Sequence, residues 1–284
     1  MYPLYAMEKD PLLRHDLHLH TTASWDAAAE MTPAAVVARA RAAGLEAVGF
    51  ADHLWLTPKG TCRPSPAYLS RKRGQEPFSP PKGVRSLSIE DGRAPDPFCV
   101  LFGVEADCAP VPGMAGGGDL KAFDFVIGSY HFADLRYGSV PRPSSPEEFT
   151  ARLLAGLRSV LEAPRVDIVG HPFHMPWRAL EHLPESLRAR IPEAVAGALE
   201  QAGPLIDLAV QRGIALELNA RALTHRGRAG LSAFFREALR RGARFVISSD
   251  AHQLAEMDGV GEVADYARGL GIRPSDLWTP PGSA

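Results

Sequence analysis

The chain has 284 residues, which is long enough for one α/β barrel or for two small domains. Apolar residues make up 45% of the chain, enough to form a substantial core. The formal net charge of -2 provides no electrostatic attraction for nucleic acid or for an anionic membrane, so neither is expected as a partner.

The cysteines and the N-terminal residues exclude further classes of protein. Cys62, Cys99 and Cys108 are odd in number and form no CxxC pair, so they indicate neither a disulfide framework nor a cysteine zinc site. Cys99 and Cys108 are expected to pack as small apolar residues. The N-terminus lacks the apolar run of a signal peptide, and no stretch approaches the roughly 18 apolar residues of a membrane span. We therefore expect a soluble, cytoplasmic protein.

Short apolar runs alternate with longer helical patterns along the chain. The runs are rich in β-branched or aromatic residues, which favours strands over buried helices. The predicted strands are residues 14–19, 46–51, 98–104, 123–128, 165–170, 214–219 and 244–249. Thr32 and Ser145 are expected to cap helices that begin at Pro33 and Pro146, and Gly44 is expected to end the first of these helices. Further helices fit about 192–212, 231–241 and 253–269.

This order of elements predicts the fold class. Seven strands that alternate with helices indicate an α/β protein whose parallel sheet is either closed into a barrel or open and doubly wound. Residues 57–97 interrupt the alternation, because they are rich in Pro, Gly, Ser and Arg and have no clear periodicity. Such a long insertion inside a compact domain is typical of an active-site lid or a disordered loop. We predict a single domain over residues 1–284 with this insertion at 57–97.

Polar side chains that suit metal ions stand at the end of every predicted strand. In chain order they are His18 with His20, then His53, Glu105, His131 and His171, then Glu217 with Asn219, and finally Asp250 with His252. The carboxyl ends of parallel strands meet at one crevice, where ligands bind. Imidazoles and carboxylates are ligands of zinc, manganese and iron, so the sequence predicts a metal site in this crevice.

The spacing of these residues supports the same interpretation. Residues i and i+2 of an extended strand point to the same side, so His18 and His20 can reach one metal together. Asp250 and His252 repeat this spacing, and Asp26 can fold back over the crevice from a short turn. Taken singly, Asp250 also suits a helix cap, and His252 also suits the surface of a first helical turn. As a set, so many buried polar groups would be costly without a metal, which favours the metal hypothesis.

The motifs on these strands resemble the PHP (polymerase and histidinol phosphatase) superfamily. They are DLHLHTTAS, ADH, GVEAD, FDFVIGSYHF, VDIVGHP, LELNA and SSDAH, and they occur in order over nearly the whole chain outside 57–97 and the termini. The resemblance implies a distorted (β/α)7 barrel with its metal site at the carboxyl-terminal ends of the strands.

The resemblance also implies three divalent metal ions, which would be manganese, zinc or iron. His18, His20, Glu105 and Asp250 would hold the first ion. Glu105 would bridge to the second, which His131 and His171 complete, and Asp26, His53 and His252 would hold the third. All nine ligand positions carry suitable residues, which argues against a degenerate, metal-free PHP domain.

Within the superfamily, FDFVIGSYHF and LELN are most similar to histidinol-phosphate phosphatases, and HTTAS with TPAAVVARARAAG is similar to nuclease-like members. The resemblance therefore implies a metal-dependent phosphomonoesterase that acts on a small phosphate ester, with L-histidinol phosphate of histidine biosynthesis as the expected substrate. The alternative is a PHP phosphoesterase or exonuclease that acts on nucleotides or oligonucleotides. A metal-stabilised binding module without turnover is a third hypothesis, which the complete ligand set disfavours.

The residues that would bind substrate are less sharply defined than the metal ligands. Arginine is expected because its planar fork binds phosphate oxygens in two places. The phosphatases usually follow the fifth-strand GH with an aspartate and a basic residue, whereas this chain has GHPFHMPWR, with Arg178 further along. After ELN it offers Arg221, Arg226 and Arg228. Arg178 and Arg226 are the candidates, and each is equally suited to be a surface arginine.

Other polar residues have two interpretations each. A protonated His174 or His225 could assist the leaving group, as could solvent, and His174 could equally fill space near the crevice. Glu217 is expected either to orient a metal-bound histidine or to sit in the barrel interior with a partner. The insertion could close over the site, where its RKRG cluster at 71–74 would meet a phosphate or form a solvated charge run.

Overall fold

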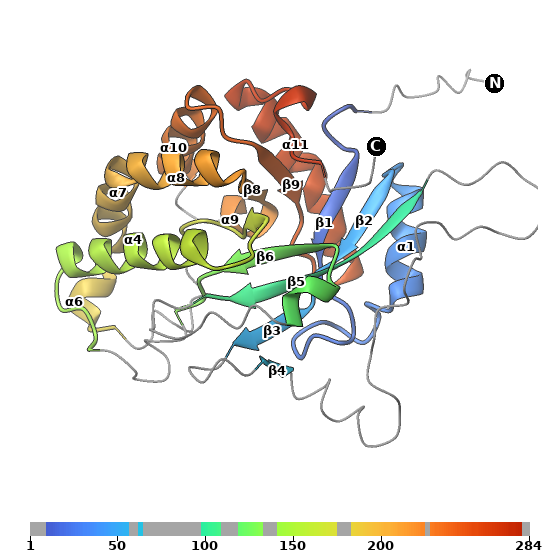
Figure 1. The fold of residues 1–284 in the computed structure, drawn as a ribbon, viewed down its shortest axis with the longest axis horizontal. Coiled ribbons are helices and arrows are strands. Elements are labelled where there is room, and N and C mark those ends of the chain that lie inside the picture. The colour runs from blue at the N-terminus through green and yellow to red at the C-terminus, as the bar shows by residue number, and fades with distance from the viewer. Residues whose placement is uncertain are drawn as a thin grey trace, which may run out of the picture.

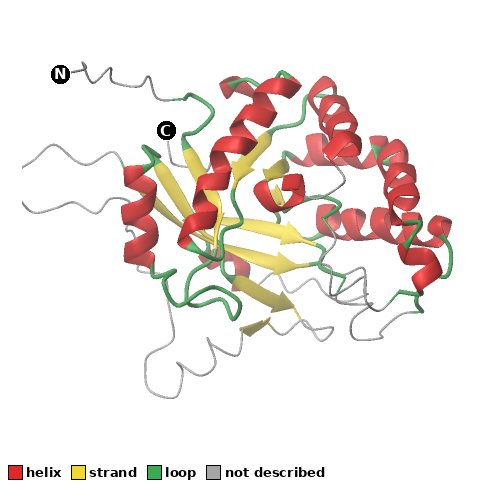
Figure 2. Cartoon of the chain, turned by 180° about the vertical axis from the view of Figure 1, so that it is seen from behind, coloured by secondary structure: helices red, strands yellow, loops and turns green. Residues whose placement is uncertain are grey.

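The protein is built around a parallel sheet that curves into a nearly closed barrel. The structure is a computed structural model that describes residues 10–56, 62–64, 98–108, 119–132, 141–174, 183–224 and 228–279. The sheet runs in the order β1-β2-β5-β6-β7-β8-β9, and β9 comes back beside β1 (Figure 1). Helices lie outside the strands, on both sides of the sheet in the view of Figure 2. The predicted (β/α)7 barrel is confirmed.

All seven predicted strands are present. The strands are β1 (His15–Leu19), β2 (Ala47–Phe50), β3 (His53–Leu56), β4 (Cys62–Pro64), β5 (Cys99–Asp107), β6 (Phe125–Ser129), β7 (Ile168–Val169), β8 (Ala215–Asn219) and β9 (Phe245–Ser248). β2 and β3 follow one another along β5, with Ala47 opposite Cys99 and His53 opposite Glu105. Glu105 therefore lies within β5, which runs further than predicted, to Asp107.

The barrel closes between its first and last strands mainly through one buried carboxylate. Leu19 forms an isolated parallel bridge with Ala251, just beyond the end of β9. The fully buried Asp16 accepts hydrogen bonds from the Ser249 N–H at 3.2 Å and from the Ser249 Oγ at 2.5 Å. Burial raises the pKa of Asp16 to about 7, although the bonds from Ser249 oppose this rise. The side chain of Asp16 thus joins two strands whose backbone ladder is incomplete.

The barrel interior is filled by apolar side chains from nearly every strand. They are Leu17, Ala51, Leu101, Phe125, Ile127, Ile168, Ala215 and Val246. The largest of them, Phe125, lies over two glycines of neighbouring strands. A Cβ atom at Gly49 would approach the Phe125 Cζ to 2.6 Å, and one at Gly103 would approach it to 2.3 Å. The two glycines therefore make room for the ring, which supports the site above it by filling the centre of the barrel.

The helices begin and end largely where the sequence predicts. They are α1 (Pro33–Ala42), α4 (Pro146–Glu162), α6 (Glu185–Arg188), α7 (Ile191–Gln201), α8 (Gly203–Arg212), α9 (Ala220–Thr224), α10 (Arg228–Arg240) and α11 (Gly259–Leu270), with short 3-10 helices at Asp119–Ala122, Leu254–Asp258 and Pro274–Asp276. Thr32 caps α1 by accepting from the Ala35 N–H at 3.3 Å, and Ser145 caps α4 by accepting from Glu148 at 3.2 Å.

Two predicted helices are divided. The helix expected at about 192–212 consists of α7 and α8, which are separated at Ala202. Pro204 causes this break, because it lacks an N–H for the helical ladder and its ring disfavours helical geometry in the preceding residue. The helix expected at 253–269 begins with a 3-10 turn, and α11 starts only at Gly259. In both cases helical residues were predicted where a break in the hydrogen-bond ladder occurs.

The remaining predictions concern the insertion, the cysteines and the surface. Of residues 57–97, only β4 lies within the described residues, where it pairs antiparallel with β3, so the lid hypothesis is not tested. Cys108 is buried in the core and Cys99 packs against the barrel interior, as expected for small apolar residues.

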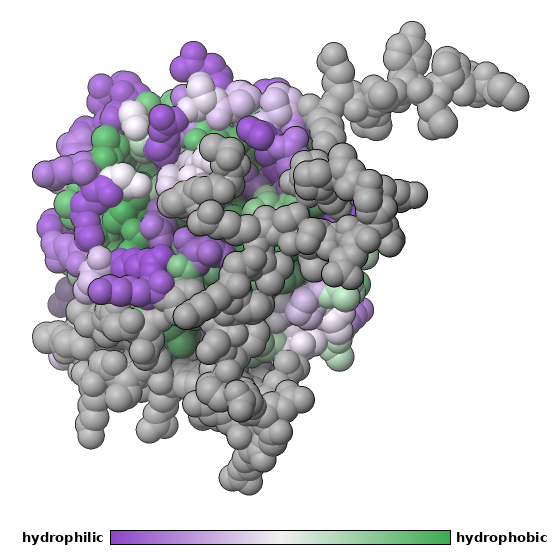
Figure 3. Space-filling view, turned by 45° about the vertical axis from the view of Figure 1, so that its right-hand side comes forward, coloured by the Kyte–Doolittle hydropathy of each residue, from purple (hydrophilic) through white to green (hydrophobic). Residues whose placement is uncertain are grey.

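The described surface in Figure 3 mixes hydrophilic and hydrophobic residues. Among the described residues, no helix combines the length and hydropathy needed to cross a membrane.

Replacing the glycine beneath Phe125 should destabilise the barrel. Gly103→Ala places a methyl group against a fully buried ring, and such overpacking costs about 1–3 kcal/mol. Chemical denaturation should show this loss in the free energy of unfolding. Gly261→Ala in α11 is the matched control, since no atom lies within 4 Å of its added Cβ, and it should stabilise by roughly 0.5–1 kcal/mol. Equal stability of the two variants would contradict the packing argument.

Candidate metal centre

The polar residues predicted at the strand ends meet at one end of the barrel. Three groups of side chains offer nitrogen or oxygen atoms within 4.8 Å of one another. The groups are His18 with His20 and Asp250, His20 with His53 and His252, and His53 with Glu105 and His131. Shared members make these groups a continuous cluster. The geometry therefore suits several metal ions placed side by side.

His18 and His20 point to the same side of β1, as their spacing predicts. Their Nε2 atoms lie 3.5 and 3.6 Å from the Glu105 Oε2. The same two atoms lie 3.7 and 3.2 Å from the Asp250 Oδ1. Both imidazoles are fully buried. Two histidine nitrogens and two carboxylate oxygens thus surround one small volume, as a first metal position requires.

Glu105 lies at the centre of the cluster. Its Oε1 is 3.2 Å from the His131 Nε2 and 2.9 Å from the His171 Nε2. Its Oε2 faces His18 and His20 and is also 2.7 Å from the His53 Nδ1. One carboxylate therefore contacts imidazoles from five positions in the chain, which is the arrangement needed for a bridging ligand.

Asp26, His53 and His252 form the outermost part of the cluster. The Asp26 Oδ2 is 3.4 Å from the His53 Nε2 and 3.3 Å from the His252 Nε2. Asp26 is the most exposed of the three, with 27% of its side chain accessible. This group is open to solvent, in contrast to the buried group around His18.

The spacing of Asp250 and His252 suggested that they lie on one face of a strand, but the structure does not place them so. β9 ends at Ser248, and Asp250 has φ +58°, in the left-handed region that residues other than glycine rarely adopt. As a result Asp250 faces His18 and His20, whereas His252 faces Asp26. His171 has φ +24°. Backbone strain of this kind is typical of functional sites, where surrounding contacts hold it in place.

Glu217 of β8 orients two of the histidines, which favours the first of its two predicted roles. It is fully buried and accepts hydrogen bonds from the His18 Nδ1 at 2.7 Å, the Asn219 Nδ2 at 3.1 Å, the His171 N–H and the Ser248 Oγ. With Nδ1 of His18 bound to Glu217, Nε2 faces the cluster. Asn219, by contrast, caps α9 by accepting from the Arg221 N–H at 2.9 Å.

The pKa values follow from burial among opposite charges. Burial alone would raise the pKa of Glu105, but the imidazoles of His131, His18 and His53 hold it well below its usual range. Burial would lower the pKa of His53, yet Glu105 and Asp26 raise it to about 10. Burial lowers the pKa of His20 well below its usual value, with help from His53 and His252. The carboxylates are therefore ionised and His20 is neutral.

The cluster fits divalent metal ions. The His18 Nε2 and the Glu105 Oε2 are buried and lie 3.5 Å apart, and neither makes a hydrogen bond of good geometry among the described residues, although the His53 Nδ1 is also close to the Glu105 Oε2. Buried polar atoms are normally hydrogen-bonded, and an atom without a partner calls for an explanation. Nitrogen and oxygen atoms that converge without hydrogen-bond geometry are explained by a cation between them. Imidazole and carboxylate donors suit zinc, manganese and iron.

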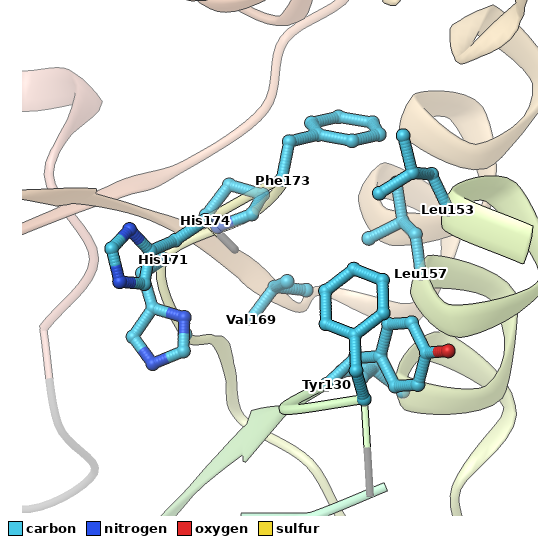
Figure 4. Close-up of a pocket in the computed structure, with 11 residues that line it drawn as sticks. Tyr130, Leu153, Leu157, Val169, His171, Phe173 and His174 are labelled. Carbon is cyan, nitrogen blue, oxygen red and sulfur yellow. The ribbon is translucent and has the colours of Figure 1, made fainter. Parts of the chain in front are cut away.

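His174 lies beside the cluster next to an apolar pocket. Its ring meets the ring of His171 edge to face, with centroids 5.4 Å apart. The pocket is small and is lined mainly by apolar side chains of α4, β7 and the segments after β6 and β7. In Figure 4 the two histidines lie on one side of it, and Leu153 and Leu157 lie on the other. His174 is thus placed near the cluster, and its role as a proton donor stays a prediction.

Several predicted substrate-binding residues fall outside the described residues. They are Arg178, Arg226, His225 and the RKRG cluster at 71–74. Arg221 is described and pairs with Glu256 at 3.1 Å. Glu256 also accepts a hydrogen bond from the His252 N–H at 2.7 Å. Arg221 thus reaches the edge of the metal cluster through one carboxylate, although Arg178 and Arg226 were preferred from the sequence.

Sequence reasoning missed the polar residues that support the cluster from behind. Ser24 is buried and contacts the His20 Nδ1 at 3.0 Å and the Asp52 Oδ1 at 2.7 Å. Asp16 forms the strand closure described above. All three residues lie within the predicted motifs, in HDLHLHTTAS and ADH. A search for polar residues adjacent to the candidate ligands, rather than for ligands alone, would have found them.

Comparisons with known proteins define the family. The model of the PHP domain matches residues 16–221, so the chain belongs to the PHP domain family. Its structure is similar to a crystal structure of histidinol phosphate phosphatase (HISK) from Lactococcus lactis subsp. lactis Il1403 complexed with zinc, L-histidinol and phosphate. The TM-score is 0.56, the sequence identity is 18%, and the match covers 96% of this chain and 98% of that chain. At this identity the likeness establishes the fold. The search of curated proteins found no match.

Divalent metal should stabilise the folded protein. The buried carboxylates and imidazoles bind metal only when the barrel brings them together, so metal binds the folded state in preference to the unfolded one. Zinc or manganese at 100 times its dissociation constant should raise the free energy of unfolding by about 2.7 kcal/mol per site relative to chelator-treated protein. Thermal or urea denaturation measures this change. Equal stability with and without metal would contradict the assignment, and Asp250→Asn should reduce the gain.

Glu217→Gln should destabilise the protein even without metal. Glutamine offers one acceptor oxygen and an amide NH2 in place of two carboxylate oxygens, so at least one buried donor would face another donor. We expect a loss of about 1–3 kcal/mol in the free energy of unfolding. The control is Glu193→Gln, an exposed residue of α7 whose ion pair with Arg190 should contribute little. If both variants unfold at the same urea concentration, Glu217 does not stabilise the barrel end.

Proposed function

We propose that the protein is a metal-dependent phosphomonoesterase that hydrolyses a small phosphate ester, with L-histidinol phosphate of histidine biosynthesis as the candidate substrate. The observation that carries this proposal is the convergence of nine imidazole and carboxylate side chains at the carboxyl ends of a PHP-family barrel. The residues are His18, His20, Asp26, His53, Glu105, His131, His171, Asp250 and His252.

The proposed ligands divide into three positions. Those of the first position are buried, and Glu105 joins them to the second, formed with His131 and His171. The third position, at Asp26, His53 and His252, is the one nearest solvent. A phosphate ester entering from solvent would therefore meet the third position first.

Closely spaced divalent ions lower the pKa of a shared water to near neutrality and neutralise charge on a transferring phosphoryl group. The residues of the chain would hold the metal ligands in position. Glu217 fixes the ring of His18 and the backbone of His171, so that both histidines are held in position. In the proposed reaction His174, whose ring contacts that of His171, would give a proton to the departing alcohol.

Two observations support a small ester over a nucleic acid. The chain carries a net charge of -2, whereas a nucleic-acid site is typically strongly basic. The structurally similar histidinol phosphate phosphatase binds zinc, L-histidinol and phosphate according to its description. Arg178 and Arg226 are the proposed phosphate clamps, with Arg221 as a third candidate through its place beside Glu256.

Phosphate release tests the proposal directly. Metal-free protein loaded with manganese or zinc would be given L-histidinol phosphate, other small phosphomonoesters and a nucleoside 3′,5′-bisphosphate. His20→Ala should reduce hydrolysis by more than about 100-fold, because it removes a buried ligand. His15→Ala is the matched control, since His15 lies at the opposite end of the same strand, and activity should remain.

The substrate comparison separates the two levels of the proposal. Strong preference for L-histidinol phosphate, lost in His20→Ala, would support the place in histidine biosynthesis. Hydrolysis of other esters with histidinol phosphate ignored would retain the metal-dependent phosphoesterase and reject that substrate. Preference for the bisphosphate would favour the nucleotide alternative, and no hydrolysis of any ester would reject the enzyme itself.

A further inference from the structure

We propose that Ser24 and Asp52 are positioning residues that form a hydrogen-bond relay, which holds the ring proton of His20 on Nδ1 and so turns its Nε2 toward the metal. The relay runs from the Asp52 carboxylate through the Ser24 hydroxyl to the imidazole. The inference rests on the proposed function only in requiring a metal at this cluster, and it is independent of the substrate.

The donors around Asp52 determine the direction of the Ser24 hydroxyl. The Asp52 Oδ1 accepts from the Thr21 N–H at 2.7 Å and contacts the Ser24 Oγ at 2.7 Å. Its Oδ2 accepts from the Thr21 Oγ1 at 2.8 Å. A carboxylate is an acceptor only, so the single hydroxyl proton of Ser24 must point at Asp52.

Once this proton is committed, Ser24 is an acceptor for its other neighbours. Its Oγ accepts from the His53 N–H at 3.2 Å and lies 3.0 Å from the His20 Nδ1. Nδ1 must then be the protonated nitrogen of His20. The opposite nitrogen, Nε2, carries its lone pair toward the Asp250 Oδ1 at 3.2 Å. A lone pair that faces a carboxylate oxygen is stabilised by a cation between them.

Burial makes the relay difficult to replace by water. His20, Thr21 and Ser24 are 0%, 4% and 3% exposed. The Ser24 hydroxyl also links two residues of the outer metal position. It accepts from the His53 N–H, and Asp26 lies two residues after Ser24 in the chain. Loss of this hydroxyl should therefore disturb the ligand geometry at two neighbouring metal positions.

The two histidines of the HxH motif are thus oriented by different groups. Glu217 binds the His18 Nδ1 directly at 2.7 Å, whereas His20 is reached through a hydroxyl. This difference provides an internal control, because a change at Ser24 should alter the His20 ring and leave the His18 ring unaffected.

Ser24→Ala tests the relay in the full-length protein. Long-range ¹⁵N–¹H spectra of metal-free protein with labelled histidine report which ring nitrogen is protonated, and His20→Ala assigns the His20 signals. The wild type should show His20 with its proton on Nδ1, and Ser24→Ala should shift it toward Nε2. Zinc affinity, measured by competition with a chromophoric chelator, should fall 10- to 100-fold, as is typical when a supporting hydrogen bond to a ligand is lost.

Two further variants keep the test decisive. Ser145→Ala removes a hydroxyl of equal size that caps α4, so it should lower stability without changing the His20 tautomer or the zinc affinity. If Ser24→Ala fails to fold, Ser24→Cys provides the same measurement, because a thiol is a weaker acceptor and donor and should give an intermediate loss of affinity.

The outcomes distinguish the relay from the proposed function. An unchanged His20 tautomer in Ser24→Ala, or zinc affinity within twofold of the wild type, would overturn the relay. Wild-type hydrolysis of phosphate esters would stand in that case. A changed tautomer together with weakened zinc binding would support the relay whichever ester proves to be the substrate.

Discussion

The burial of one carboxylate, Glu105, among imidazoles is the interaction on which the rest of the structure depends. It is 1% exposed and faces nitrogen atoms of His18, His53, His131 and His171 at 2.7–3.5 Å. A charge in such a place is costly unless it is paired or bound to metal. Pairing it requires side chains from strands far apart in sequence, and only a closed, parallel arrangement brings all their carboxyl ends to one point. The barrel therefore provides the one place in the fold where this charge is buried among its partners.

Around this centre, a second layer of hydrogen bonds limits how the ligands can move. Glu217 restrains His18 and the backbone of His171, and Ser24 restrains His20. Such restraint explains how His171 and Asp250 keep positive φ values that isolated chains would relax. The apolar packing of Phe125 on Gly49 and Gly103 supports this layer from within the barrel. These contacts thus restrict the geometry of the candidate ligands, and such restriction favours selectivity among metal ions.

The sequence alone predicted the seven strands, the two helix caps at Thr32 and Ser145, and the residues that gather at the barrel end. These predictions succeeded because apolar runs and polar residues at strand ends can be recognised locally in the sequence. The parallel barrel then brings the strand ends close together. The spacing of Asp250 and His252 did not indicate their separate directions, which depend on a left-handed residue after β9, and only the family resemblance assigned them to different ions. Ser24 and Asp52 were missed because serine and aspartate in turns usually bond to their own backbone. Which arginine meets phosphate depends on distances between loops, and composition carries no such information.

The closure of the barrel between β1 and β9 links folding of the chain to metal binding. His20 and Asp250 meet in the candidate metal centre although 230 residues separate them, and Asp16 joins the same two strands through Ser249. Contacts of such long range form slowly, because the entropy of closing a long loop must be paid before the contact stabilises the chain. A chain whose last strand has not docked lacks one carboxylate of this centre, even if every other strand is in place. Metal uptake by the buried side chains around His18 would therefore report the completion of folding, and a ribosome-bound chain would lack this uptake until its final strand closed the barrel.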